Sequence, residues 1–273
     1  MLVRKPFFVS CIINLLFCLS LSCQEARESV SFECILDKSL TFAILQDESN
    51  LYCYKAFNLE FSPIHMQARW VGYFVSRERL ETKSLKRQGI GFEKDEKIRG
   101  GSANNDDYRR SGYDRGHLTP ARDMAFSKET FLESFLFSNI SPQTPSFNRG
   151  KWAELEKFVR KLAKKYEMLY VVTGPILPNY EYDENSECKT IGENKVFVPF
   201  YFFKALLFYS KEKVEAIAFI MPNKKLKENL SFFACSVDYM EEIVGIDVFA
   251  SLPDEIEERV EIEYDEEFWF CND

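Results

Sequence analysis

The 273-residue chain is poor in the residues that build structural metal sites. It has two histidines and no Cys-x-x-Cys pair, which excludes zinc fingers, His-Glu-x-x-His metalloproteases and multi-histidine metal cages. It also has no internal repeat or low-complexity tract. Hydrophobic residues make up 46% of the chain and aromatic residues 15%, so it can bury a real core, as one large domain or two small ones.

Positive charge is scarce in total, with 35 Lys and Arg against 43 Asp and Glu and a net charge of −8. This total argues against a nucleic-acid partner, because phosphate binding requires cations. The charge is unevenly distributed, however. Residues 60–170 carry 21 Lys and Arg against 15 Asp and Glu, a net charge of +6, whereas residues 171–273 carry 9 against 22, a net charge of −13. The basic middle is the expected anion-binding region, and the acidic run 254–267 is typical of a solvated face or a helix end.

Long apolar runs are absent after the first residues. Arg4 and Lys5 precede an apolar run over residues 7–22, which is shorter than the roughly 20 residues of a membrane span and typical of a secretory signal peptide. We therefore expect a signal peptide over 1–22, an N-terminal extension over 23–50 and the main domain over 51–273. The expected location is extracytoplasmic: secreted, periplasmic or membrane-anchored.

A bacterial lipoprotein signal is an alternative for the same leader. Ser22 before Cys23 resembles its cleavage site, and a lipidated Cys23 would tether the protein to a membrane. Five cysteines follow: Cys34, Cys53, Cys188, Cys235 and Cys271. Because this number is odd, at most two disulfides form and one thiol stays free, with the connectivity open.

Strand and helix patterns are interspersed without a regular βαβ period, which predicts an α+β fold. Apolar residues spaced three and four apart over 148–166 predict an amphipathic helix with Lys and Arg on its other side. Residues 98–112 are rich in Gly and Ser and read as a loop. Strands are expected over residues 70–76, 168–173, 196–209 and 214–221.

The densest cluster of chemically distinctive residues is DRGHLTP at 114–120. In an extended segment Arg115 and His117 point to one face, and Asp114 points to the other, where it would anchor the strand. Arginine binds phosphate and a neutral histidine can deprotonate water, so this pair suits phosphodiester cleavage. Taken alone, the Arg-x-His pair is weak evidence, and a structural histidine is the more common reading of His117. His65 is interpreted as a loop or strand-edge residue.

Three more polar residues follow this cluster. Asn139 lies in SNISPQ, Asn148 starts the expected helix, and Glu156 lies about 12 Å further along its axis. Because helical side chains lean toward the N-terminus, Glu156 reaches back toward Asn148. Their amide and carboxylate oxygens suit a hydrated hard cation such as Mg²⁺, although Asn148 is also a common N-cap and Glu156 a common surface charge.

Together, DRGHLTP, SNISPQ and FNRGKWAELE resemble the DNA/RNA non-specific endonuclease family of ββα-metal, or His-Me finger, nucleases. The resemblance covers roughly residues 52–260. It implies the ββα-metal nuclease fold, with a central, mostly antiparallel sheet flanked by helices in a single domain. It also makes a structural role for His117 improbable.

The resemblance further implies catalytic roles. His117 would be the general base that activates water, and Arg115 would contact the phosphate and stabilise the transition state. Glu156 would orient metal-bound water, and Asn139 would support the site. The chemistry would be metal-assisted, without a covalent intermediate.

For the metal, the resemblance makes Asn148 the only direct protein ligand of Mg²⁺, with Mn²⁺ as a substitute, and places Arg149 beside it against the substrate. The expected function is a secreted or surface-anchored Mg²⁺-dependent endonuclease that cuts DNA and RNA to 5′-phosphate products. The alternative is a catalytically inactive nucleic-acid-binding surface lipoprotein. Oligomeric state is open, with a homodimer among the options.

Overall fold

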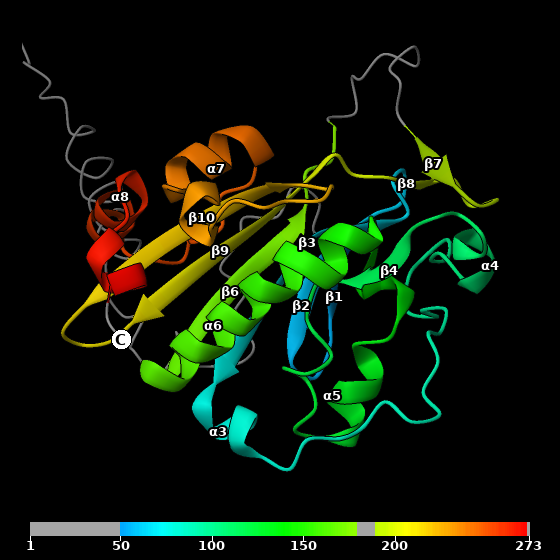
Figure 1. Ribbon diagram of the computed structural model, residues 1–273, viewed down its shortest axis with the longest axis horizontal. Coiled ribbons are helices and arrows are strands. Elements are labelled where there is room, and N and C mark those ends of the chain that lie inside the picture. The colour runs from blue at the N-terminus through cyan, green and yellow to red at the C-terminus, as the bar shows by residue number, and fades with distance from the viewer. Residues whose placement is uncertain (1–49, 179–188, 272–273) are drawn as a thin grey trace, which may run out of the picture. The chain divides into compact units, whose positions relative to one another are not determined.

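The computed structural model describes residues 50–178 and 189–271, and a seven-stranded antiparallel sheet forms its centre (Figure 1). Helices flank this sheet, so the predicted α+β fold is confirmed. The expected leader and extension, with Cys23 and Cys34, lie outside the described residues, as does Cys188. The domain boundaries 51–273 stay a prediction. Cys53, Cys235 and Cys271, the cysteines that are described, are free thiols.

Neighbouring strands in the sheet follow the order β1-β2-β3-β6-β9-β10-β11. Their bounds are β1 Leu51–Cys53, β2 Phe57–Ser62, β3 Gln67–Ser76, β6 Met168–Pro175, β9 Tyr201–Tyr209, β10 Val214–Pro222 and β11 Ala234–Cys235. Two separate pairings join β4 (Asp114–His117) to β5 (Ile140–Gln143) and β7 (Thr190–Ile191) to β8 (Val196–Phe197).

The helices are short apart from one. They are α3 Arg77–Glu81, α4 Asn105–Tyr108, α5 Lys128–Glu133, α6 Ala153–Lys165, α7 Val237–Val244 and α8 Asp254–Ile262. Shorter or irregular turns are η2 Phe137–Asn139, η3 Phe147–Trp152, η4 Leu230–Phe233 and η5 Glu267–Cys271. Within the described ranges, no helix has both the length and the apolar character to cross a membrane.

Local departures from the expected elements have physical causes. The strand predicted over 168–173 continues through Gly174 as β6, because a Cβ on Gly174 would lie 2.2 Å from the Arg69 carbonyl oxygen and only glycine permits this approach. The loop predicted over 98–112 contains α4, since Asn104 and Asp107 form a capping box around it.

The long helix α6 carries Glu156 and packs against the sheet. It packs across β3 and β6 (Figure 1) through a stripe that includes Leu155, Val159 and Leu162, all buried. Burying each such side chain contributes about 1.5–3 kcal/mol. The predicted helix over 148–166 is therefore present, although a non-helical Gly150 (φ −107°, ψ −109°) interrupts η3, the turn that leads directly into α6.

The acidic C-terminal part forms α7 and α8, which pack on each other and on β10. The run 254–267 is only partly solvated, because Glu261 on α8 is 4% exposed and its Oε1 has no hydrogen-bond partner within the described residues. Carboxylate oxygens of Asp238, Glu241 and Glu261 lie within 4.8 Å of one another, a spacing that could hold a metal ion. Burial, followed by these neighbouring carboxylates, raises the pKa of Glu261 to about 9.

A Glu261→Gln variant should lose part of the pH dependence of stability. Because the pKa of Glu261 is raised on folding, its contribution is full below about pH 4.5 and is lost as pH rises toward 9. Thermal unfolding should therefore give the variant a higher Tm than wild type at pH 8–9, by roughly 2–4 °C for each 1 kcal/mol recovered. Glu258→Gln, exposed on the same helix, is the control. Identical pH profiles for wild type and Glu261→Gln would refute this.

Candidate active site

The candidate site is built on the β4–β5 hairpin, where Asp114 pairs with Gln143 and His117 with Ile140. Gly116 is required at its centre. A Cβ there would lie 2.3 Å from the side chain of Gln143, which folds over the hairpin. Pairing with β5 therefore fixes the direction of the DRGH side chains on β4, with alternate residues on opposite faces.

His117 packs against two aromatic rings that also contact each other. Its ring centroid is 5.3 Å from that of Phe92 and 5.0 Å from that of Phe135. Its Nε2 is buried without a hydrogen-bond partner in the described part of the chain. Burial, and then the charge of Arg87, lowers the pKa of His117 to about 3. The imidazole is thus neutral at physiological pH, as a general base must be.

Phe92 brings two arginines to this histidine. The Arg87 guanidinium lies 4.8 Å from the centroid of Phe92, and that of Arg115 lies 5.5 Å from it. Arg115 is half-buried and donates from Nη2 to the Asn105 carbonyl oxygen at 3.3 Å. Sequence reasoning placed Arg115 and His117 on one face but missed Arg87, which lies 30 residues before His117 in a segment without periodicity.

On the other face, Asp114 binds the start of the helix. Its Oδ2 accepts hydrogen bonds from Asn148 Nδ2 at 2.9 Å and Arg149 Nε at 2.7 Å, and its Oδ1 accepts from Arg149 Nη2 at 2.6 Å. Partial burial opposes ionisation, but these bonds prevail and lower the pKa of Asp114. Asp114, expected only to anchor its strand, orients the Asn148 amide. Arg149 was expected to bind the substrate. Its side chain is 73% exposed, and it forms an ion pair with Asp114.

The Asn148 amide fits a hard cation. Its Nδ2 is fixed by Asp114, which leaves Oδ1 as the oxygen of this amide that could bind a cation. Amide oxygens suit Mg²⁺, which keeps most of its waters and takes few protein ligands. The backbone N–H of Asn148 donates to the Thr144 carbonyl oxygen at 2.9 Å, which fixes the turn that carries the amide. These residues therefore fit the predicted ion.

Glu156 lies in a buried cluster of charges. Arg160 Nη1 is 3.0 Å from Asp123 Oδ1 and 3.9 Å from Glu156 Oε2. Lys204 is fully buried under Trp152, 4.7 Å from its ring centroid. Burial, and then Asp123, raises the pKa of Glu156, while Lys204 and Arg160 oppose the rise. Glu156 is therefore held in place and is not an ordinary surface charge.

Asn139 and His65 serve the framework. Asn139 is fully buried; its Oδ1 accepts from the Thr119 N–H at 2.9 Å, and its Nδ2 donates to the Thr119 and Ser134 carbonyls. It thereby fixes the segment that follows His117. His65, predicted to lie in a loop or at a strand edge, is in the turn between β2 and β3, buried and 2.7 Å from Ser62 Oγ through Nδ1.

Comparison with known proteins gives consistent similarities. A family model described as DNA/RNA non-specific endonuclease matches residues 39–255. Human mitochondrial endonuclease G is 34% identical over 199 residues, covering 70% of this chain and 67% of the human protein. Caenorhabditis elegans mitochondrial endonuclease G is 35% identical over 216 residues, covering 75% and 69%. A crystal structure of the EndoG/EndoGI complex superposes with a TM-score of 0.69 at 29% identity, covering 76% of this chain and 88% of that one.

These relatives correct one expectation. The mitochondrial nuclease of Saccharomyces cerevisiae is 34% identical over 202 residues, covering 67% of this chain and 60% of the yeast protein. Because it and both endonuclease G proteins are named as mitochondrial, the predicted extracytoplasmic location is wrong. The similarities give no support to a secretory signal peptide, a lipidated Cys23 with its membrane tether, or a homodimer.

His117 should stay neutral down to about pH 4 and titrate near pH 3. Replacing Arg87 with Met should raise the pKa of His117 but leave it below 6.5, because burial is the larger cause. Imidazole ¹H–¹⁵N correlation spectra can follow this, since the chain has two histidines and a His65→Gln variant assigns the second. A His117 pKa at or above 6.5 in the wild type would contradict a neutral imidazole with a buried Nε2.

Proposed function

This chain belongs to the DNA/RNA non-specific endonuclease family, and we propose that it hydrolyses phosphodiester bonds of DNA and RNA with the help of a divalent cation, leaving 5′-phosphate ends. The observation that carries this proposal is the two-sided hairpin. One face of β4 presents a neutral imidazole with two arginines, and the other fixes the amide that would hold the ion. Mg²⁺ is the expected cation, with Mn²⁺ as a substitute.

In the proposed reaction, His117 takes a proton from the water whose oxygen attacks phosphorus. The bond to the 3′ oxygen breaks, and the leaving oxygen takes a proton from solvent. Arg87 and Arg115 stabilise the added negative charge on the phosphoryl oxygens, because they lie beside the histidine in a partly buried place. A divalent cation, when bound, neutralises charge on the leaving oxygen. Asn148 would hold this cation, and Glu156 would orient water beside it.

A basic hollow of about 500 Å³ is an argument for a polyanionic substrate. It lies between α3 and α6, and Arg122, Lys157, Lys161 and Lys164 line it. Arg160, which also lines it, reaches Glu156 in the charge cluster, so the hollow adjoins the candidate site. Contacts of this kind go to the phosphate backbone and carry no sequence information. They account for a non-specific nuclease despite the acidic total charge.

The names of the relatives lead us to propose a mitochondrial location. The first 24 residues contain Arg4 and Lys5 and no Asp or Glu, and mitochondrial transit peptides are likewise basic and poor in acidic residues. Imaging of the full chain with a C-terminal fluorescent tag tests this, and a tag found only in the medium would contradict it.

His117→Ala should lower kcat for plasmid DNA and for RNA by about 10²–10⁴, the usual value of a general base. EDTA should abolish wild-type cleavage, and added Mg²⁺ should restore it. His65→Gln is the matched control, and it should cut at the wild-type rate once circular dichroism has shown that it folds. Metal-loaded wild type that binds nucleic acid without cutting it would favour the inactive binding protein instead.

Asp114→Asn should raise the Mg²⁺ concentration for half-maximal cleavage by about 10–100-fold, the usual cost of losing a group that orients a metal ligand. The reason is that Asp114 fixes the Asn148 amide and neutralises Arg149. Asp265→Asn is the control, because Asp265 also pairs with a cation, Lys213, but lies in the acidic C-terminal part. An unchanged Mg²⁺ requirement in Asp114→Asn would remove Asp114 from this role.

A further inference from the structure

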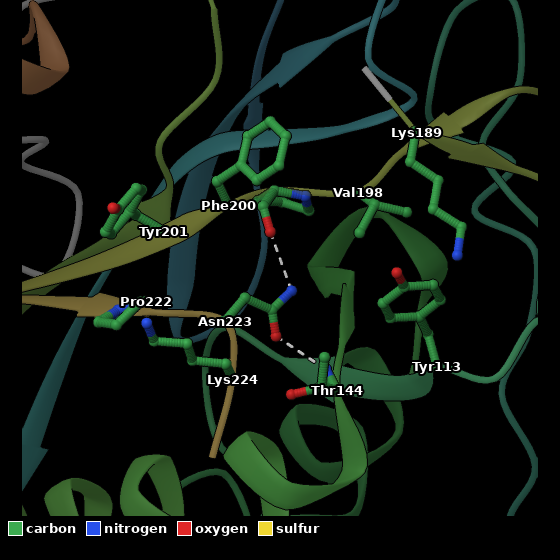
Figure 2. Close-up of a pocket in the computed structure, with 10 residues that line it drawn as sticks. Tyr113, Thr144, Lys189, Val198, Phe200, Tyr201, Pro222, Asn223 and Lys224 are labelled. Carbon is green, nitrogen blue, oxygen red and sulfur yellow. Dashed lines mark hydrogen bonds between the residues drawn. The ribbon is translucent and has the colours of Figure 1, made fainter. Parts of the chain in front are cut away.

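A second hollow lies at the open end of the β4–β5 hairpin (Figure 2). Its volume is about 330 Å³. Figure 2 shows Phe200 and Tyr201 on one part of its rim and Tyr113 with Lys189 on another, while Asn223 and Thr144 form its base. Neither the hydrolysis of the phosphodiester nor the predicted ion uses any of these side chains.

The hollow adjoins the candidate active site through the chain itself. Tyr113 directly precedes Asp114, and Thr144 directly follows Gln143, the partner of Asp114 in the hairpin. The carbonyl of Thr144 also accepts the backbone N–H of Asn148. His117 lies four residues after Tyr113, about 13 Å away at the usual strand rise. A strand cut beside His117 would therefore bring a nearby nucleotide to this hollow.

The base of the hollow is rigid. Asn223 Nδ2 donates to the carbonyls of Pro142 at 3.0 Å and Pro199 at 2.9 Å, and its Oδ1 accepts from the Thr144 N–H at 2.8 Å. One amide thus joins the end of β10 to β5 and to the segment before β9. A preformed hollow loses less entropy when a ligand binds than one that must be ordered.

Its rim combines exposed aromatic rings with cations. Phe200 is 59% exposed and Tyr201 is 47% exposed. Lys189 Nζ lies 4.9 Å from the centroid of the Tyr113 ring, and Lys224 lies on the same rim. Aromatic side chains that stack on bases, set in a positively charged groove, are the features that bind single-stranded nucleic acid without regard to sequence.

We propose that this hollow stacks an unpaired base of the substrate strand, next to the phosphate that is cut, so that the enzyme favours single-stranded DNA or RNA. This inference rests on the proposed nuclease function for its position in the reaction. The stacking itself, however, is a binding event that can be measured without cleavage.

The test compares Phe200→Ala with Phe232→Ala, which removes another exposed phenylalanine, 73% exposed, outside the hollow. Binding of a fluorescently labelled single-stranded oligonucleotide is measured by anisotropy in EDTA, where no cutting occurs. Phe200→Ala should bind about 5–100-fold more weakly, the range expected for loss of one base stack. Phe232→Ala should bind like wild type, and Phe200→Trp should restore binding.

A second measurement separates bases from phosphates. An abasic oligonucleotide of the same length should bind wild type and Phe200→Ala equally, because it keeps the phosphates and lacks the rings. If Phe200→Ala weakens both oligonucleotides alike, or neither, base stacking is refuted. With cleavage restored by Mg²⁺, Phe200→Ala should raise KM for single strands more than for duplex and leave kcat unchanged. Absence of any cleavage would overturn the proposed function and leave the binding result to decide the hollow.

Discussion

The site depends on a set of charges that share one buried place. Asp123, Glu156, Arg160 and Lys204 come from the segment after β4, from α6 and from β9. Burying any one of these charges alone would cost free energy. Together they compensate one another, but only if the three elements keep their relative positions. This requirement holds α6 at a fixed distance from the hairpin. Loss of one member would leave its partners charged and buried. The positions of Glu156 and of the hairpin therefore both depend on this cluster.

Two side chains, Phe92 and Asp114, organise the residues on the two faces of β4. Phe92 gathers Arg87, Arg115 and His117 around one ring, so a single apolar side chain sets the spacing of two cations and a base. Asp114 does the equivalent on the other face by binding Asn148. The alternation of side chains along the four-residue strand β4 thereby separates the proposed base, His117, from the proposed metal ligand, Asn148. The proposed mechanism needs this separation, because the attacking water and the leaving oxygen lie on opposite sides of the phosphorus.

Much of the fold and of the candidate site can be predicted from the sequence, because the backbone geometry of a strand or a helix determines which side chains of a short motif lie on one face. The pairing of Arg115 with His117 follows from strand alternation, and the helix after Asn148 follows from its apolar spacing. Arg87 was missed because only tertiary contacts with aromatic rings bring it to the site. The predicted location was wrong. It rested on Arg4, Lys5 and the apolar run over 7–22, and a basic start is also a feature of mitochondrial transit peptides. Residue patterns define local geometry well, but they do not distinguish leaders that share a composition.

The separation of charge along the chain becomes a separation in space. The basic residues of α6 lie over β3 and β6, while acidic α7 and α8 lie beside β10 (Figure 1). The protein therefore carries an electric dipole across its sheet. In the field of a polyanion such a dipole experiences a torque, which turns the α6 side toward the nucleic acid and the acidic helices away from it before contact is made. A negative protein can in this way approach a negative substrate in the orientation that its active site requires.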